Sequence, residues 1–305
     1  MKSALPPLLL ALLAACSSAP EEPCSSADLE PARALAAAGD YDGAAAALAD
    51  FDREDFDRAG QSEYSLLAGD VAYAREDWDQ AIHHYEEYLL SAGLASESER
   101  VEERLFEMAM QLLNGERRAF GIFPDRGRGV VTLHNLATWA PNSPWAAQAL
   151  ATAANYSFSE GQYAEAAMDY RQLLEQHPDS EFTDLANFRL GMCGFLQIDG
   201  PWVDGRLIER SAAQLRFYLD HYPSGLYRSE AEQALARLER WSGERELLIG
   251  DYYETIDNVR GARYHYQRAR TSPVAEIARE AERLLAALPP NPPLEVPADE
   301  QEAGG

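Results

Sequence analysis

The sequence is nearly without lysine: Lys2 is the only one among 305 residues, so every other basic residue is arginine. Because an arginine guanidinium keeps its proton at working pH, the chain beyond Lys2 has no residue to form a Schiff base or to serve as a P-loop lysine. The charge is also one-sided, with 51 Asp and Glu against 26 Lys and Arg and a formal net charge of −25. Nucleic-acid binding relies on basic side chains that displace phosphate counterions, so this balance argues strongly against a nucleic-acid partner and disfavours docking on anionic lipid.

The apolar run at the N-terminus is short. It extends from Leu8 to Ala15 and follows the charge at Lys2, whereas a helix needs about 20 apolar residues to cross a bilayer. A charged start, a short apolar run and small residues have the layout of a secretory signal. We therefore predict that residues 1–15 are a signal peptide.

Cysteine is scarce, and recognisable catalytic motifs are missing. Cys16, Cys24 and Cys193 have no zinc-finger spacing; Cys24 and Cys193 either pair with each other or remain free, with Cys193 as a small buried hydrophobe. The chain has no nucleophile elbow, Walker loop or HExxH motif. These absences predict a protein that is not an enzyme.

Two clusters of potential metal ligands are better explained as solvated polar residues. His83 and His84 are adjacent, and a helix directs neighbouring side chains about 100° apart, which suits a two-ligand metal site poorly. The acidic run at 50–55 lacks the glycine and the final glutamate of a calcium loop. We therefore predict no metal site and no cofactor other than a covalent lipid.

A helical hairpin recurs between residues 28 and 288. Each copy reads as a helix, a turn with Gly or Asp and a second helix, often followed by proline. The clearest copies are SEYSLLAGDVAYAREDWDQAIHHYEEYLL, SPWAAQALATAANYSFSEGQYAEAAMDYRQLLEQHPDS and ELLIGDYYETIDNVRGARYHYQRARTSP, and AAAGDYDGAAAALADF is weaker. They resemble the tetratricopeptide repeat (TPR), a hairpin of about 34 residues.

The spacing of small and aromatic residues has a physical reason. Gly69 on the first helix and Ala81 on the second are small enough for the helices to approach closely. Tyr85, four residues after Ala81, lies on the same face and fills the gap to the next hairpin. We predict an all-α fold, a TPR-like solenoid of about five to six hairpins with a capping helix at 274–288, followed by a disordered acidic tail at 289–305.

Two hairpins are stretched by inserted loops. The first insertion lies between Met110 and Leu133 and the second between Phe195 and Leu215, and both place aromatic, Gly and Pro residues where a plain repeat has a tight turn. We predict that these loops bind partners through Phe120, Phe123, Arg126, Trp202, Asp204 and Arg206.

The end of the apolar run, Leu13-Ala14-Ala15-Cys16, resembles the lipobox of bacterial lipoproteins. The resemblance implies a diacylglycerol thioether on Cys16 and acylation of the new N-terminus, with fatty acids such as palmitate. Several acyl chains hold a protein on a membrane far more firmly than one. Ser17 at the sorting position implies the periplasmic face of the outer membrane. Residues 16–27, rich in Ser, Pro and Glu, are expected to form a lipidated flexible tether.

The lipobox, tether, hairpins and inserted loops together resemble the BamD-like outer-membrane lipoproteins of the β-barrel assembly machinery. The most specific stretch is DGPWVDGRLIERSAAQLRFYLDHYPSGLYRSEAEQALARLERWSGERELLIGDYY. The resemblance implies a scaffold that contacts the β-barrel insertase through its C-terminal half and unfolded outer-membrane protein segments through its N-terminal half. Other assembly lipoproteins are further implied partners, and the lipid is the only attachment to the membrane.

Two other functions remain open from the residues. The first is a TPR adaptor of the cell envelope, of the Tol-Pal, peptidoglycan or cell-division type. The second is a lipid-anchored enzyme that uses the Asp and Glu clusters, which no motif supports. For a binding scaffold, the excess of acidic residues predicts a groove lined by acids that prefers basic or neutral peptides and loses affinity with salt.

Overall fold

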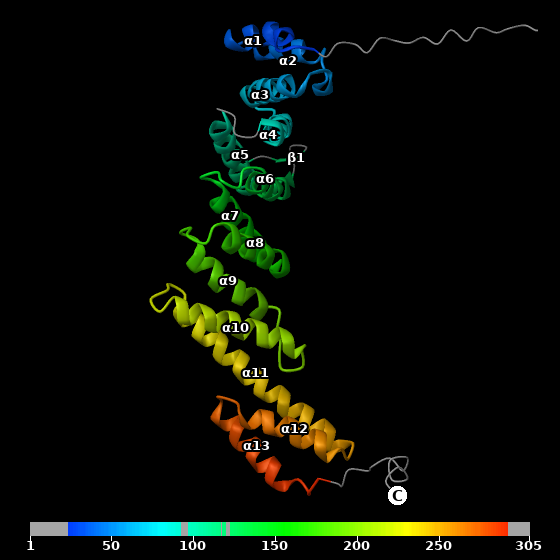
Figure 1. Ribbon diagram of the computed structural model, residues 1–305, viewed down its shortest axis with the longest axis vertical. Coiled ribbons are helices and arrows are strands. Elements are labelled where there is room, and N and C mark those ends of the chain that lie inside the picture. Colours follow the sequence, from blue (N-terminus) through cyan, green and yellow to red (C-terminus); the bar gives the residue numbers. More distant parts are fainter. Residues whose placement is uncertain (1–23, 93–96, 117, 120–122, 292–305) are drawn as a thin grey trace, which may run out of the picture. The chain divides into compact units, whose positions relative to one another are not determined.

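The computed structural model describes residues 24–92, 97–116, 118–119 and 123–291 (Figure 1). The chain forms two compact units that divide between Ser98 and Glu99. Among the described residues, no helix combines the length and the apolar character needed to cross a membrane.

The first unit is built from short helices and two helical hairpins. Its elements are η1 (Ser26–Leu29), α1 (Glu30–Ala37), α2 (Tyr41–Leu48), η2 (Arg53–Asp55), α3 (Arg58–Ala74) and α4 (Trp78–Ala92). Its core contains Leu29, Leu48, Phe56 and Tyr64, contributed by successive elements. The unit therefore buries apolar surface between successive elements, in addition to Ile82 and Tyr85 within the α3–α4 hairpin.

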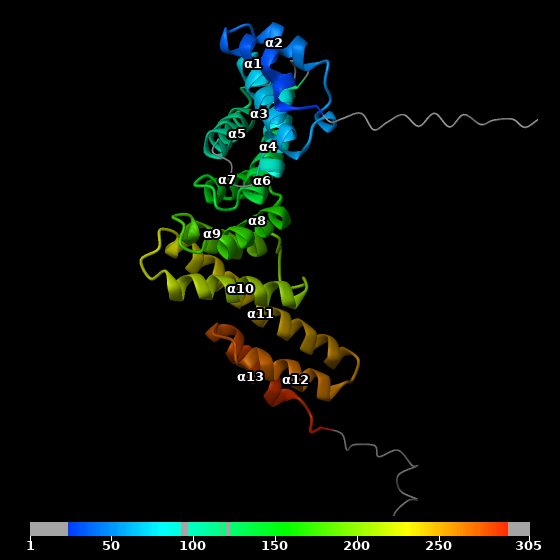
Figure 2. The same ribbon diagram turned by 45° about the horizontal axis from the view of Figure 1, so that its top comes forward.

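The second unit continues the helical pattern. Its elements are α5 (Ser98–Leu113), β1 (Arg118–Ala119), β2 (Phe123–Pro124), α6 (Arg126–Trp139), α7 (Ala146–Ser159), α8 (Tyr163–Gln176), α9 (Thr183–Phe195), α10 (Gly205–His221), α11 (Arg228–Thr255), α12 (Val259–Arg270) and α13 (Ala275–Ala287). Consecutive helices from α6 to α13 pack against one another, and Figure 2 shows α10, α11 and α12 side by side. Across the described residues, thirteen α-helices form six hairpins and a final helix, which confirms the predicted all-α, TPR-like solenoid.

The plain hairpins repeat one hydrogen bond. The hydroxyl groups of Tyr85, Tyr170 and Tyr266 each donate to a side chain 15 residues earlier on the first helix. The acceptors are Asp70 at 2.8 Å, Asn155 at 2.6 Å and Asp251 at 2.6 Å. The same tyrosines are almost completely buried, so each ring fills the hairpin while its polar end stays satisfied.

Glycine allows the closest approach of these rings. A Cβ atom at Gly69 would lie 2.5 Å from the Tyr85 ring, and one at Gly250 would overlap the Tyr266 ring in the same way. The spacing of Gly69 and Ala81 predicts this close approach of the two helices, but Tyr85 was expected in the gap to the next hairpin, and its ring instead packs inside its own hairpin.

The turns of the plain hairpins share a left-handed residue. It is Gly39 between α1 and α2, Glu76 between α3 and α4, Gly161 between α7 and α8, and Asp257 between α11 and α12. Glycine adopts this backbone conformation without the Cβ clash that other residues suffer. Side chains complete three of these turns, because Asp40, Asp77 and Asn258 accept backbone amides at the start of α2, α4 and α12.

One helix is longer than a repeat requires. Helix α11 has 28 residues, and its first half packs Ala231, Ala234 and Leu238 into a core with α9 and α10. Its second half places Leu247 against α12 and α13. The first half of α11 therefore packs on the α9–α10 hairpin, and its second half packs on α12 and α13. This single helix connects the hairpin that carries the inserted loop to the last hairpin.

The ends of the folded region differ from the sequence expectation. Residues 24–27, expected in the tether, are part of the fold: the Cys24 amide donates to the Asp55 carbonyl at 2.7 Å, and Ser25 starts η1. At the other end, Arg263 donates to Asn291 Oδ1 at 3.0 Å, so residues expected in the tail are held against α12. Specific backbone and side-chain partners, which composition does not reveal, cause both differences.

Candidate partner-binding site

The loop at 196–204 interrupts the hairpin formed by α9 and α10. Its first part is held to the fold, because Gln197 donates to the Cys193 carbonyl at 2.7 Å and Ile198 is buried in the core beside Phe188 and Ile208. The loop therefore starts from a fixed point.

Trp202 lies at the tip of this loop and is 72% exposed. A Cβ atom at Gly200 would overlap its indole ring, so glycine lets the ring lie directly against the backbone. Pro201 between them is buried. The Trp202 side chain therefore packs against the backbone at Gly200 and remains largely exposed to solvent.

Arg245 of α11 fixes the second half of the loop. Its Nε donates to the Val203 carbonyl at 3.2 Å, and its guanidinium lies where a Cβ atom at Gly205 would come within 3.1 Å. The long helix α11 thus carries the residue that holds the loop at the start of α10.

Asp204 and Arg206 lie next to Trp202 and interact with each other. Asp204 caps α10 by accepting the Arg206 amide at 3.0 Å, and this bond is the main cause of the lowered pKa of Asp204. The Arg206 guanidinium approaches the same carboxylate at 3.5 Å but remains mostly exposed. Three of the predicted partner-binding residues are therefore brought together on one surface.

A groove of about 360 Å³ is lined by α10, α11 and the end of α12, and a neighbouring hollow reaches the loop at Asp204. Glu246 lies buried at its base and accepts from His265 at 2.7 Å, while Arg268 approaches Glu246 at 3.2 Å and Glu209 at 3.6 Å. The groove is lined by Ile208, Glu209, Ala212, Arg216, Leu238, Glu239, Ser242, Gly243, Glu246, Arg268, Thr271, Ser272 and Pro273.

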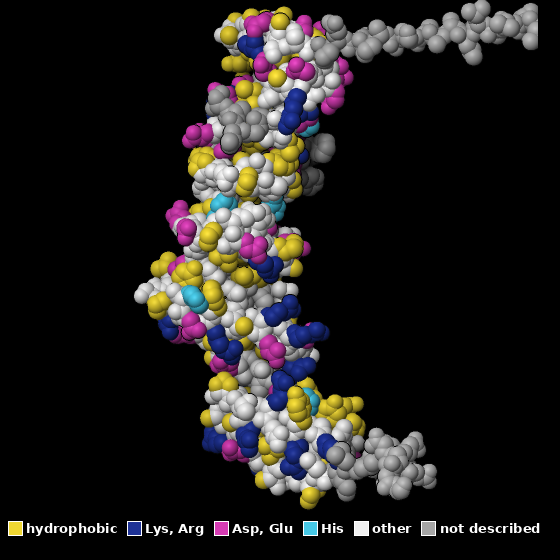
Figure 3. All heavy atoms as spheres, in the orientation of Figure 1, with side chains coloured by type: hydrophobic (Ala, Val, Ile, Leu, Met, Phe, Trp, Pro, Cys, Tyr) yellow, Lys and Arg dark blue, Asp and Glu magenta, His cyan; other side chains and the backbone are white. Residues whose placement is uncertain are grey.

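The charge of this groove differs from the expectation of an acid-lined surface. Arg216 and Arg268 stand among its three glutamates, and Arg206 and Arg245 line the neighbouring hollow. Figure 3 shows arginine side chains over α10 and α11. The chain's excess of acids is therefore not concentrated here, because the arginines of α10–α12 balance them.

The remaining predicted residues lie elsewhere. Cys16 and Phe120 lie outside the described residues, and of Phe123 only the backbone is described, paired with Ala119 in the β1–β2 ladder. Arg126 is exposed at the start of α6, where its Nε donates to the Leu113 carbonyl at 3.2 Å. It belongs to the α5–α6 hairpin, whereas Trp202, Asp204 and Arg206 belong to the α9–α10 hairpin.

The structure also shows two residues that the sequence does not single out for this site, Arg245 and Glu246. Each is positioned by contacts with distant segments: the carbonyl that Arg245 binds lies 42 residues earlier, and the histidine that binds Glu246 lies 19 residues later. No local motif marks them. Only the packing of α11 between α10 and α12 reveals their place.

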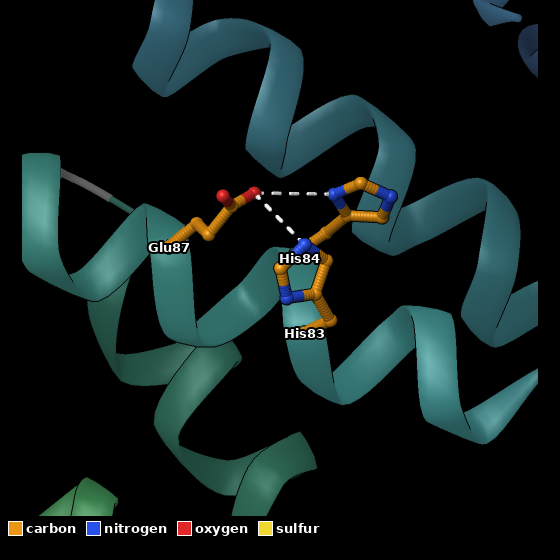
Figure 4. Close-up of side chains that lie close together, drawn as sticks. All are labelled: His83, His84 and Glu87. Carbon is orange, nitrogen blue, oxygen red and sulfur yellow. Dashed lines mark hydrogen bonds and ion pairs between the residues drawn. The ribbon is translucent and has the colours of Figure 1, made fainter. Parts of the chain in front are cut away.

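A separate cluster in the first unit corrects one expectation. His83 and His84 do not point apart: their ring centroids are 5.1 Å from each other, and both rings approach the Glu87 carboxylate (Figure 4). His83 Nε2 and His84 Nδ1 lie 3.7 and 3.4 Å from Glu87 Oε2. The angle between neighbouring helix positions does not account for Glu87, one turn further along α4, toward which both side chains bend.

Comparison with protein families gives a match over the segment that contains the inserted α9–α10 loop. Residues 126–267 match the model of a family described as YfiO: Outer membrane lipoprotein, and the matched segment includes the α9–α10 loop and most of the adjoining groove. Comparison with curated proteins gave no match. The family match confirms, over residues 126–267, that the chain is similar to the BamD-like outer membrane lipoproteins.

Proposed function

We propose that this protein is a lipid-anchored scaffold of the β-barrel assembly machinery, which binds partner and substrate polypeptides without catalysing a reaction. The observation that carries the proposal is the α9–α10 loop, which presents Trp202 and Arg206 while Arg245 holds its backbone. This loop lies inside the segment that matches the outer-membrane lipoprotein family.

The chemistry of the loop suits a protein partner. Tryptophan and arginine are the residues most often found at energetic centres of interfaces, and a loop that is already ordered loses little entropy on binding. The adjoining groove supplies Glu209 and Arg268 as polar neighbours. We infer that a β-barrel insertase, with other assembly lipoproteins, docks at this surface.

The first unit offers a different kind of surface. A cleft between α2, α3 and α4 is lined mostly by small and apolar residues, including Leu48, Tyr64, Ala68 and Val71. An extended, apolar peptide fits such a lining better than a charged one. We infer that unfolded segments of outer-membrane proteins bind here.

The anchor belongs to the same proposal. Acyl chains on Cys16 would hold the protein on the periplasmic face of the outer membrane. We expect Cys16→Ser to move the protein from the membrane fraction to the soluble periplasm. If the variant stays with the membranes, the anchor is a different feature.

The partner proposal is tested by recovering bound proteins from solubilised envelopes. The wild-type chain is compared with Trp202→Ala and with a control, Tyr252→Ala, which removes another exposed aromatic residue on α11. We expect the wild type and the control to recover a large β-barrel insertase and Trp202→Ala to recover at least tenfold less. Recovery of peptidoglycan-associated or division proteins in place of the insertase would instead show a TPR adaptor of the envelope.

A further inference from the structure

The cluster of His83, His84 and Glu87 on α4 has the donor set of a divalent transition-metal site. One ligand atom from each residue, two imidazole nitrogens and one carboxylate oxygen, lies within 4.8 Å of the others. Figure 4 shows both rings directed toward the carboxylate. This cluster lies in the first unit and is separate from the α9–α10 loop.

The spacing of these atoms fits tetrahedral zinc. Zinc binds histidine nitrogen at about 2.0–2.1 Å, which places neighbouring tetrahedral ligands about 3.3 Å apart. The two distances to Glu87 Oε2 are 3.4 Å from His84 Nδ1 and 3.7 Å from His83 Nε2. The two imidazole nitrogens lie within 4.8 Å of each other, so all three ligand atoms are close enough to surround one ion.

The two oxygens of Glu87 face different partners. Oε2 faces the imidazoles, whereas Oε1 lies 4.0 Å from Arg53 Nε, and the same Nε donates to the buried Ser65 hydroxyl at 3.2 Å. Arg53 therefore approaches the carboxylate from the side that the ion does not need. A group in this position orients a ligand rather than replacing it.

The two histidines differ in exposure. His84 is mostly buried between the Glu87 side chain and the Tyr64 ring, whose centroid is 5.9 Å away. His83 is 56% exposed, so an ion and its remaining water ligand have access from solvent.

We propose that His83, His84 and Glu87 bind one zinc ion, or a similar divalent transition ion, with a fourth coordination position left to water. All three ligands come from a single helix, so the ion adds a charged, exchangeable position to the surface of α4 instead of joining two helices. The open position suits a carboxylate or imidazole of a bound polypeptide.

The test measures zinc binding by the purified full-length chain without a polyhistidine tag. Titration calorimetry with ZnCl₂ is expected to give one ion per chain, and cobalt substituted at the site is expected to show the strong visible absorption of a tetrahedral centre. His83→Ala and Glu87→Gln change exposed or half-buried side chains and are expected to weaken zinc binding at least tenfold. Arg53→Gln is expected to weaken it less, because Arg53 only orients Glu87.

The matched control is His221→Ala, which removes an exposed histidine at the end of α10. It is expected to bind zinc as the wild type does. Circular dichroism of each variant shows whether its helices are intact. The proposal is overturned if the wild-type chain takes up no zinc, or if His83→Ala and Glu87→Gln bind it as tightly as His221→Ala.

Discussion

Two adjacent hairpins of the second unit differ in the connection between their two helices. In the α7–α8 hairpin, Ser159 and Tyr163 are joined by a tight turn around left-handed Gly161, and Tyr170 closes the interior by donating to Asn155. In the α9–α10 hairpin, the turn is replaced by the loop at 196–204. There Gly191 meets Leu215 in place of a tyrosine.

The difference separates the scaffold from the functional surface. The α7–α8 hairpin exposes only small and polar residues at its turn, 159–162, and Tyr170 fills its interior, so its features serve packing. The α9–α10 hairpin keeps the close helix contact but uses the extra residues to expose Trp202 and Arg206. In this molecule, departures from the repeat mark the candidate site, and the repeat itself holds that site in place.

The largest expected effect is a loss of stability caused by a change inside the plain α7–α8 hairpin. Ala166 of α8 is fully buried, and Ala166→Leu would force extra volume between α7 and α8 at a cost of about 1–3 kcal/mol in the free energy of unfolding. A lower midpoint in thermal or urea unfolding checks this. Glu165→Leu, at an exposed position on the same helix, serves as the control. Equal stability of the two variants would contradict the packing described for this hairpin.

The next largest effect is expected on partner binding by the stretched α9–α10 hairpin. Arg245→Ala removes the bond to the Val203 carbonyl and the packing against Gly205, so the loop loses order and binding of the insertase is expected to weaken about tenfold, or about 1.4 kcal/mol. Arg240→Ala, on the same helix and in exposed ion pairs, is the control. Unchanged binding by Arg245→Ala would show that the loop does not need this support.

A smaller loss of stability is expected from a change in the tight α7–α8 turn alone. Gly161 has a φ of 77°, and a Cβ atom at this position would meet no other atom within 4 Å, so Gly161→Ala should destabilise the protein through backbone strain alone, by about 1 kcal/mol. The reverse change, Asp257→Gly in the α11–α12 turn, should be neutral or slightly stabilising. Chemical denaturation of both variants tests whether these turns are set by backbone conformation.

The smallest perturbation concerns Cys193. Cys193 is fully buried in α9, and burial raises its pKa to about 12. At pH 8 a thiol reagent is expected to label Cys193 only after unfolding. The raised pKa means that ionisation destabilises the fold, so the contribution of Cys193 is complete below its ordinary pKa of about 9 and is lost as pH rises toward 12. Rapid labelling of Cys193 in the folded chain would contradict the packing of α9.

Much of the fold follows from local sequence signals. Gly69 and Ala81 predict the close helix contact, and the prolines at 141, 178, 223 and 273 follow the ends of α6, α8, α10 and α12, because each of these signals acts within one hairpin. The length of α11 is less predictable, since no residue near Gly243 compels a break and only packing against α12 and α13 shows that the helix continues.

The site is less predictable than the fold. Trp202, Asp204 and Arg206 stand out in the sequence because aromatic and Gly-Pro residues replace a turn. Arg245 and the His83–Glu87 contact do not, because they depend on three-dimensional placement: one joins segments far apart in sequence, and the other depends on side-chain rotamers along a helix. The excess of acidic residues led to the prediction of an acid-lined groove, but a net charge of −25 gives no information on where arginines gather.

The comparison of the two hairpins is tested most directly by photo-crosslinking in intact envelopes. A photoreactive amino acid is placed at Trp202 in one chain and at Glu160, exposed in the tight α7–α8 turn, in the other. We expect a crosslink from position 202 to a large β-barrel insertase and none from position 160. Equal crosslinking from both positions, or crosslinking from position 160 alone, would contradict the claim that the stretched hairpin carries the partner-binding surface.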